Sequence, residues 1–398
     1  MAVSFQEHVV RMLEKGWHRL PQPYRTPLFL ASCTVLLITP FAWKKLTYRP
    51  ELLPPPPKHY QYRLHLANGG SSTLTLPDGR KIGYAQYGDL NGKPIIALHG
   101  ILGYRLENAL FDADAKELGM RIVGVERPGI GWSSSDSRPL SERKVLDHAK
   151  DVEALAEHLQ LGEYAVMGTS GGGPYALACA YALPSSASKP RLRAVSVVTG
   201  LGLPDMSQAW PPLLVFLNRH FDLRWLIKSV FIRGPVWKLH LSNEERMEGM
   251  RKSFDVKKAH PADVETAKNP DYPDWVRLFL RSTREAVSQG WAGFLDDAAI
   301  LSVEPGFRVG EIRAELPVQL WYGTDDTNVS PKAGDETAQQ LIAGGNTNVE
   351  LHMEPGETHG SVQRKYRKEI LADLLRAMDS QACFLTCLTY PSTQSVTT

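Results

Sequence analysis

AVMGTSGGGP, residues 165–174, is the stretch of this sequence that decides the fold. A short apolar run ends at Gly168, Ser170 follows two residues later, and glycines occupy the next positions. This is the G-x-S-x-G pattern of a strand that turns sharply into a helix with a serine at the apex. Such a turn exposes the hydroxyl at the end of a sheet and directs a backbone N–H of the following helix toward an anion. The alternative interpretation is a glycine-rich turn without chemistry.

Short apolar runs of strand length lie on both sides of this turn in the sequence. They alternate with segments of helical spacing, which predicts a mostly parallel sheet covered by helices on both faces, an α/β fold. A hairpin with its turn at Asp78-Gly79 precedes the parallel strands. The expected helices are 141–159, a helix from the serine turn through Tyr181, and 362–378. The expected strands are 72–76, 81–87, 94–98, 121–125, 163–167, 193–198, 318–322 and 349–353.

The stretch from about 201 to 315 breaks this alternation. Its large apolar residues recur at helical intervals, so we expect several helices inserted between two strands. They would form a lid over the carboxyl edge of the sheet, where ligands bind in α/β folds. Most of the large side chains should form the core of the insertion, and the others should line an apolar substrate pocket. They are Trp210, Leu214, Phe216, Trp225, Phe231, Trp237, Trp275, Phe279, Trp291 and Phe294.

The composition is that of a globular protein without a strong charge bias. Of the 398 residues, 43% are hydrophobic and 22% are charged. The 45 basic and 43 acidic residues leave a formal net charge of +2, which gives no support to a nucleic-acid partner. The four cysteines, Cys33, Cys179, Cys383 and Cys387, show neither metal-ligand spacing nor a disulfide framework.

Residues 28–43, LFLASCTVLLITPFAW, carry no charge and are followed directly by Lys44 and Lys45. A helix of this length spans about 24 Å, somewhat less than the ~30 Å hydrocarbon core of a bilayer. Phe41 and Trp43 are typical of an interfacial anchor. We favour a single N-terminal membrane anchor over a buried helix packed on the domain. The predicted localisation is therefore membrane-associated, whereas the compartment, the orientation and the oligomeric state stay open.

The chain is expected to have three parts. Residues 1–59 form the membrane-anchor segment and a proline-rich linker, in which Pro54–Pro57 is a stiff, extended spacer. Residues 60–380 form the α/β domain with its lid insertion. Residues 381–398 form a C-terminal tail that we expect to be disordered.

A serine hydroxyl becomes a useful nucleophile only when a base and a carboxylate accompany it. On this architecture the expected chain order is Ser, then Asp or Glu, then His, each after a strand. Ser170 is followed by Asp325 and Asp326 after the next-to-last expected strand, and by His359 after the last. We favour Asp326 for the acid, with Asp325 as the alternative. His352 competes with His359, but its place inside a strand points it at a face of the sheet.

An acyl-transfer site also needs two backbone donors for the developing oxyanion. The N–H of Gly171, directly after the serine, is one candidate. The N–H of Ile101, in the loop HGILG at 99–103, is the other. His99 is either a hydrogen bonder that holds this loop or a structural histidine at a strand end. The proposed chemistry needs no metal and no cofactor.

The chain resembles the α/β-hydrolase superfamily over about residues 76–378. This resemblance implies an α/β-hydrolase fold with a helical lid and a triad of Ser170, Asp326 and His359. The chain departs from the common pattern at Leu102, where the family often has Pro, and at Glu126, where it often has Asp. The motifs are LPDGRKIGYAQYG (76–88), HGILG (99–103), ERPGIGWS (126–133), GTSGGGPYALACA (168–180), YGTDD (322–326) and GETHG (356–360).

The expected function is that of a serine hydrolase that cleaves an ester or related acyl bond through an acyl-enzyme intermediate. The apolar lid and the predicted anchor point to a hydrophobic small-molecule substrate. A serine nucleophile argues against the epoxide hydrolase and haloalkane dehalogenase chemistries of the superfamily, which use Asp. Two alternatives remain: C–C hydrolysis or acyl transfer by the same triad, and a catalytically silent binding protein. The resemblance leaves the substrate open, because the superfamily includes esterases, lipases, thioesterases, peptidases and C–C bond hydrolases.

Overall fold

The chain divides into two units, Met1–Glu51 and Leu52–Thr398, and the sheet, the lid and the candidate site all belong to the second. The predicted anchor at 28–43 lies outside the described residues. Within the described part of the chain, no helix is both long and apolar enough to cross a membrane. The computed structural model describes residues 15, 48–57, 60–62, 64, 70–101, 103–183, 191–204, 206, 228–229 and 235–388.

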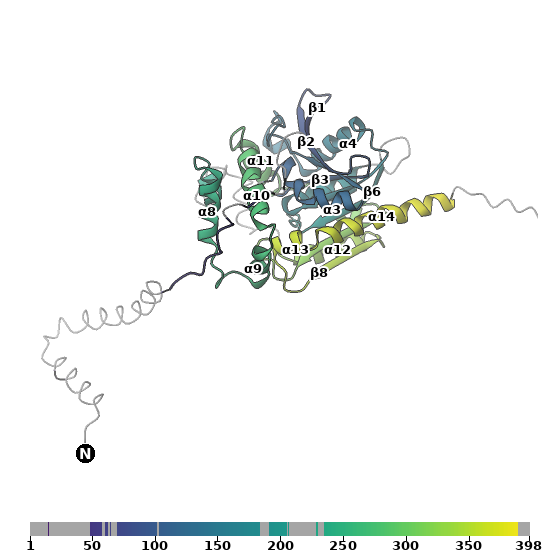
Figure 1. Cartoon of the computed structure of the whole chain (residues 1–398). Helices are drawn as coiled ribbons and strands as arrows, with labels where there is room; N and C mark the ends of the chain where they lie inside the picture. Colours follow the sequence, from purple (N-terminus) through teal and green to yellow (C-terminus); the bar gives the residue numbers. More distant parts are fainter. Residues whose placement is uncertain are drawn as a thin grey trace, which may run out of the picture. The chain divides into compact units, whose positions relative to one another are not determined.

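An eight-stranded, mostly parallel sheet forms the centre of the second unit, which confirms the predicted fold class (Figure 1). The strand order is β1-β2-β4-β3-β5-β6-β7-β8. The two pairs β1–β2 and β2–β4 are antiparallel, and all later pairs are parallel. The strands are β1 Ser71–Thr75, β2 Lys81–Gly88, β3 Lys93–Leu98, β4 Met120–Val125, β5 Glu163–Thr169, β6 Arg191–Val198, β7 Val318–Gly323 and β8 Val349–Glu354.

The central strands are buried on both faces because helices cover each side of the sheet. In β3, Ile96 and Leu98 join the core cluster beneath helices α4, α5 and α12. Ile95 and Ala97 join a second cluster beneath α3 and α14. This alternation follows from the two-residue period of a strand. The helices are α3 Asp112–Glu117, α4 His148–His158, α5 Gly173–Ala182, α12 Lys332–Ala343, α13 His359–Lys365 and α14 Arg367–Leu388.

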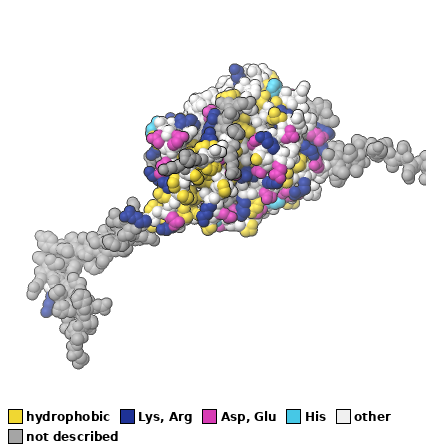
Figure 2. All heavy atoms as spheres, viewed as in Figure 1, with side chains coloured by type: hydrophobic (Ala, Val, Ile, Leu, Met, Phe, Trp, Pro, Cys, Tyr) yellow, Lys and Arg dark blue, Asp and Glu magenta, His cyan; other side chains and the backbone are white. Residues whose placement is uncertain are grey.

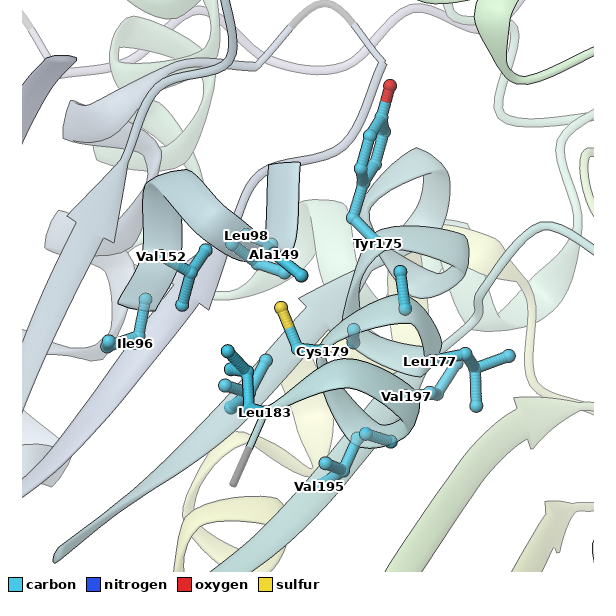
Figure 3. Packing of buried hydrophobic residues seen from close by; sticks show 14 of the residues in the cluster. Ile96, Leu98, Ala149, Val152, Tyr175, Leu177, Cys179, Leu183, Val195 and Val197 are labelled. Carbon is cyan, nitrogen blue, oxygen red and sulfur yellow. The ribbon is translucent and has the colours of Figure 1, made fainter. Parts of the chain in front are cut away.

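The larger core cluster packs the helix after the serine turn against its neighbour and the sheet (Figure 3). Cys179 on α5 is fully buried in it, and burial raises the pKa of its thiol, so this cysteine is a packing residue. Tyr175 on the same helix extends away from the labelled core side chains, with its hydroxyl at the far end (Figure 3). This orientation places a polar group at the edge where the candidate site lies.

Two predicted helices are interrupted in the structure. The first, expected from 141, begins as an α-helix only at His148, after two short 3-10 turns, η3 Leu140–Glu142 and η4 Val145–Asp147. Lys144 is extended, and its N–H donates to the side chain of Asp147 at 3.0 Å, which satisfies a donor outside the helix.

The second interrupted helix is the predicted 362–378. Here α13 begins earlier, at His359, with Thr358 as its N-cap. Tyr366 separates α13 from α14. Helix α14 then continues to Leu388, into the stretch 381–398 that we expected to be disordered. No Gly or Pro stops it before Pro391.

The regular elements described in the insertion between β6 and β7 are helices joined by loops, as the sequence predicts. Trp237, Trp291 and Phe294 pack together in its core, with ring centroids of the two tryptophans 5.0 Å apart. The predicted residues Trp210, Leu214, Phe216, Trp225 and Phe231 lie outside the described residues. The described elements are η6 Pro235–Trp237, α8 Asn243–Ser253, α9 Pro261–Lys268, α10 Tyr272–Ala286, α11 Ala292–Ile300 and η7 Val309–Glu311.

Candidate active site

Ser170 lies at a strained turn between β5 and α5. Its φ is +53°, in the left-handed region that residues other than glycine rarely adopt. Strain of this kind costs about 1–3 kcal/mol and occurs often at functional sites. Two glycines of the motif are required by close approach: a methyl group on Gly168 would lie 2.3 Å from Gly172 O, and one on Gly172 would lie 2.2 Å from Leu98 O. The tight packing therefore explains the G-x-S-x-G pattern.

Asp326 and His359, which are 33 positions apart in the sequence, form a hydrogen bond. Nδ1 of His359 lies 2.7 Å from Oδ2 of Asp326, whose side chain is fully buried. The other oxygen, Oδ1, accepts the N–H groups of Asn328 and Val329 at 2.8 and 2.9 Å. Because a carboxylate can only accept, Nδ1 carries the proton, and Nε2 of a neutral ring is then the acceptor. This is the tautomer that a general base requires.

Asp325, the alternative acid, points elsewhere. Its side chain is 47% exposed, and its Oδ2 lies 3.0 Å from Nε2 of His260 at the start of α9. Hydrogen bonds from Thr324 and His260 lower the pKa of Asp325 below its usual value. The structure therefore brings His359 together with Asp326 and links Asp325 to the lid.

His352, the alternative base, lies on β8 and stacks on Trp321 with ring centroids 3.8 Å apart. Its Nε2 is 3.8 Å from Glu350 and 3.7 Å from Asp373. Glu350, His352 and Asp373 are the one group of three potential metal ligands, among the described residues, whose ligand atoms lie within 4.8 Å of one another. Asp373 is paired with Arg376 at 2.5 Å, and we assign no metal to this group.

The two predicted oxyanion donors belong to backbone segments that touch. A methyl group on Gly171 would lie 2.8 Å from the backbone N of Ile101. Gly100 approaches the serine, since a methyl group there would lie 3.4 Å from Cβ and 3.8 Å from Oγ of Ser170. The loop after β3 therefore lies beside the turn after β5, because the two parallel strands are neighbours in the sheet. Leu102, the departure from the family pattern, lies outside the described residues.

A buried arginine that the sequence analysis did not single out holds this loop. Arg127 donates to the carbonyl oxygens of His99 at 2.6 Å and of Gly100 at 3.0 Å. It also forms a bidentate ion pair with Asp297 on α11, at 2.7 and 2.8 Å. Oδ1 of Asp297 accepts the hydroxyl of Tyr175 at 2.7 Å as well. The loop after β3, the lid and α5 are thus joined through the Arg127–Asp297 pair.

His99 holds the same loop from the other side. Burial and the neighbouring Arg127 charge keep the pKa of His99 well below its usual range, so the ring is neutral. Its Nδ1 lies 2.8 Å from the carbonyl oxygen of Gly100, and since that oxygen only accepts, Nδ1 is the donor. Of the two interpretations of His99, the structure favours the hydrogen bonder that holds the loop.

Glu126, the other departure from the family pattern, is paired with a buried arginine. Its Oε1 accepts from Arg105 at 2.6 Å, with both side chains fully buried. Its Oε2 accepts the N–H of Trp132 at 2.7 Å. The guanidinium of Arg105 also lies over the Trp132 ring, 3.7 Å from its centroid. Glu126 therefore anchors the loop after β4 and is not a reacting group.

A pocket of about 70 Å³ opens beside Ile101, between the loop after β3, α10 and α13. Leu110 and two of the large apolar residues that the sequence analysis named in the insertion, Trp275 and Phe279, supply apolar walls. Glu107 lies at the same pocket, and burial raises the pKa of its carboxyl. The remaining lining residues are Gly103, Leu278, Ser282, Gln363 and Arg364. Nothing in the sequence pattern singled out Glu107, because its burial depends on the neighbouring loop and helices.

We expect Gly171→Ala to lower kcat by about 100- to 1,000-fold, the usual cost of losing one oxyanion donor. The added methyl group would lie 2.5 Å from Cγ1 and 2.8 Å from N of Ile101, so the two donors must move apart. Initial rates on a p-nitrophenyl ester measure this effect. Gly162→Ala is the matched control, because nothing lies within 4 Å of the added methyl group. An unchanged kcat in folded Gly171→Ala protein would exclude this pair of donors.

Comparisons with known proteins identify the family to which this fold belongs. A family model described as alpha/beta hydrolase fold matches residues 93–361. The chain is 30% identical over 159 residues to a proline iminopeptidase of Xanthomonas citri, covering 39% of this chain and 43% of that protein. It is 27% identical over 173 residues to lipase 1 of Psychrobacter immobilis, covering 41% and 52%. The chain thus spans about half of the length of these curated relatives, or less.

Solved structures show the same fold at low sequence identity. A carboxylesterase structure from the Thaumarchaeon Nitrososphaera gargenis superposes with a TM-score of 0.53 at 18% identity, covering 78% of this chain and 99% of that chain. An esterase from Exiguobacterium antarcticum gives a TM-score of 0.52 at 16% identity, covering 77% and 99%. These similarities describe the fold and leave the substrate open.

Proposed function

This chain belongs to the α/β-hydrolase fold family, and from that premise we propose that it is a serine hydrolase of carboxylic esters. The observation that carries the proposal is the buried Asp326–His359 hydrogen bond of 2.7 Å, at the sheet edge where Ser170 occupies its strained turn. The curated relatives named as lipase and iminopeptidase support hydrolysis of an acyl bond in general.

In the proposed reaction, Oγ of Ser170 attacks the carbonyl carbon of the ester while Nε2 of His359 takes the hydroxyl proton. Asp326 holds the ring in the required tautomer and stabilises the imidazolium that forms. The carbonyl oxygen becomes an oxyanion, which accepts hydrogen bonds from the N–H groups of Gly171 and Ile101. These donors are fixed before the reaction, because Arg127 and His99 hold the loop that carries Ile101.

The tetrahedral intermediate then collapses, and the bond between the carbonyl carbon and the alcohol oxygen breaks. His359 returns its proton to the leaving alcohol, and Ser170 remains acylated. A water molecule repeats the sequence: His359 takes its proton, the acyl–oxygen bond to Ser170 breaks, and Oγ is protonated again. The products are one carboxylic acid and one alcohol for each water consumed.

The pocket beside Ile101 supports a small-molecule ester with an apolar group next to the scissile carbonyl. Leu110, Trp275 and Phe279 would contact such a group, and burying each CH₂ contributes about 0.8 kcal/mol. The expectation of a membrane anchor at 28–43 rests on the sequence alone and remains a proposal.

A fluorophosphonate probe tests the assignment, because it phosphonylates an activated serine. We expect one adduct per chain, and peptide mapping should place it on Ser170. Ser170→Ala should abolish labelling and turnover of p-nitrophenyl esters, whereas Ser137→Ala, an exposed serine outside the site, should change neither. Labelling of the Ser170→Ala protein on another serine, or absence of labelling and of ester turnover in the folded wild type, would overturn the proposal.

A further inference from the structure

A second and much larger cavity lies on the outer side of the lid. It has a volume of about 590 Å³, within the range of pockets that hold small organic ligands. The segment around Pro54–Pro57 forms one wall, and helices α8, α9 and α10 form the others. Hydrophobic side chains gather on the surface where this segment meets α8 and α9 (Figure 2).

The proline segment is fixed to the lid rather than extending from it as the predicted spacer. Leu52 bridges to Asp255, and the carbonyl oxygen of Leu53 accepts from Arg251 at 2.7 Å. On the other side of the prolines, Tyr60 donates from its hydroxyl to Asp274 at 2.7 Å. The wall is therefore held at both ends, and the compact unit begins at Leu52, before the predicted domain start at residue 60.

The lining chemistry favours an alkyl chain. Proline has no backbone N–H, so four consecutive prolines present a wall without donors. Met247 and Met250 on α8 supply flexible thioether side chains, which adapt to irregular apolar ligands. Val276 on α10 completes the apolar lining.

Two acidic and two basic residues line the cavity, and Lys268 is the basic residue that could meet an anionic end of that chain. Glu248 is engaged by Arg251 at 2.7 Å, and Lys252 lies 3.4 Å from it. Lys268, at the end of α9, and Glu244, at the start of α8, are the other two charged residues of the lining, and both are exposed. A carboxylate next to Lys268 would complement its positive charge.

The cavity is separate from the pocket beside the candidate site, although one helix lines both. Tyr272 and Val276 of α10 face the outer cavity, whereas Trp275 and Phe279 face the pocket beside Ile101. Each pair has a spacing of four residues, so each follows one side of the helix. A ligand in the outer cavity would therefore lie behind α10 and not at Ser170.

We propose that this outer cavity binds the alkyl chain of a fatty acid, with its carboxylate at Lys268. It is a binding site distinct from the one that would hydrolyse esters. The fatty acid is bound without covalent change.

Titration with cis-parinaric acid, a fluorescent fatty acid, tests the proposal in the full-length Ser170→Ala protein, which cannot turn over an ester probe. We expect saturable binding that Met250→Glu weakens by at least about tenfold. The new carboxylate would lose hydration when the alkyl chain covers it, and it would repel the carboxylate of the fatty acid. Lys268→Gln should weaken binding of the acid several-fold and leave its methyl ester unchanged. Ile342→Glu, which replaces an apolar residue that is 60% exposed on α12, is the matched control and should bind as the parent does.

Val276→Trp is a second cavity variant, which fills the volume and needs no buried charge. It should also weaken binding, and its unfolding transition shows whether the fold is kept. Saturable binding that neither Met250→Glu nor Val276→Trp changes would place the chain elsewhere and overturn the proposal, as would an absence of saturable binding. Fluorophosphonate labelling of the same variants in the Ser170 background measures the esterase assignment independently.

Discussion

Asp326→Asn is expected to lower kcat for a p-nitrophenyl ester by about 10⁴-fold, the magnitude seen when the acid of a serine-hydrolase triad becomes an amide. The Asp326 carboxylate accepts from Nδ1 of His359 at 2.7 Å and from two backbone N–H groups. An asparagine that presents its NH₂ to the histidine would favour the tautomer with the proton on Nε2. That ring cannot take the proton of Ser170, so the geometry survives and the base is lost.

The neighbouring carboxylate gives a matched control. Asp325→Asn removes the same charge one position earlier, but Asp325 bonds to His260 and is 47% exposed. We expect its kcat to change by less than about threefold, since an exposed hydrogen bond contributes little. Steady-state kinetics with thermal unfolding of both variants make the comparison. Equal losses in the two variants, or a loss confined to Asp325→Asn, would contradict the assignment of Asp326.

Asp297→Asn is expected to destabilise the fold by about 3–5 kcal/mol, because it leaves the buried charge of Arg127 without its counterion. Arg127 and Asp297 are both nearly inaccessible and form two hydrogen bonds with each other. The same change should lower kcat, since Arg127 also holds the carbonyl oxygens of His99 and Gly100. Urea unfolding gives the free energy, and initial rates give the catalytic effect.

Glu304→Gln is the control for this second experiment. It removes the ion pair between Glu304 and Lys144, whose side chains are 61% and 47% exposed respectively. The change should alter the free energy of unfolding by at most about 1 kcal/mol. A destabilisation of Asp297→Asn no larger than that of Glu304→Gln would show that the buried ion pair does not tie the lid to the sheet. Normal stability with a lowered kcat would restrict its role to positioning the oxyanion loop.

The sheet could be predicted because its signals are local. Each central strand reads as a short apolar run, and every predicted strand appears within two residues at each end. Helix boundaries were harder, because side chains compete with the backbone at the ends. Asp147 moves the start of α4 to His148, and α14 passes the expected end of the domain because no helix-breaking residue stops it.

The positions of Ser170, Asp326 and His359 could also be predicted, because parallel strands deliver their following loops to one edge. The sequence favoured Asp326 over Asp325 but could not decide between them, because adjacent residues share the same local signals. Burial separates them: the loop turns one carboxylate inward to His359 and the other outward to His260.

The sequence by itself determined where the strands lie along the chain, the turn at Ser170 and the residues that follow each strand. These depend on the two-residue period of strands and on glycines at fixed positions, which act over a few residues. Only the tertiary structure decided which side chains meet. Arg127 and Asp297 are 170 positions apart, and Tyr60 and Asp274 are 214 apart. No local pattern encodes such pairs, because their contact depends on how helices and loops pack over the sheet.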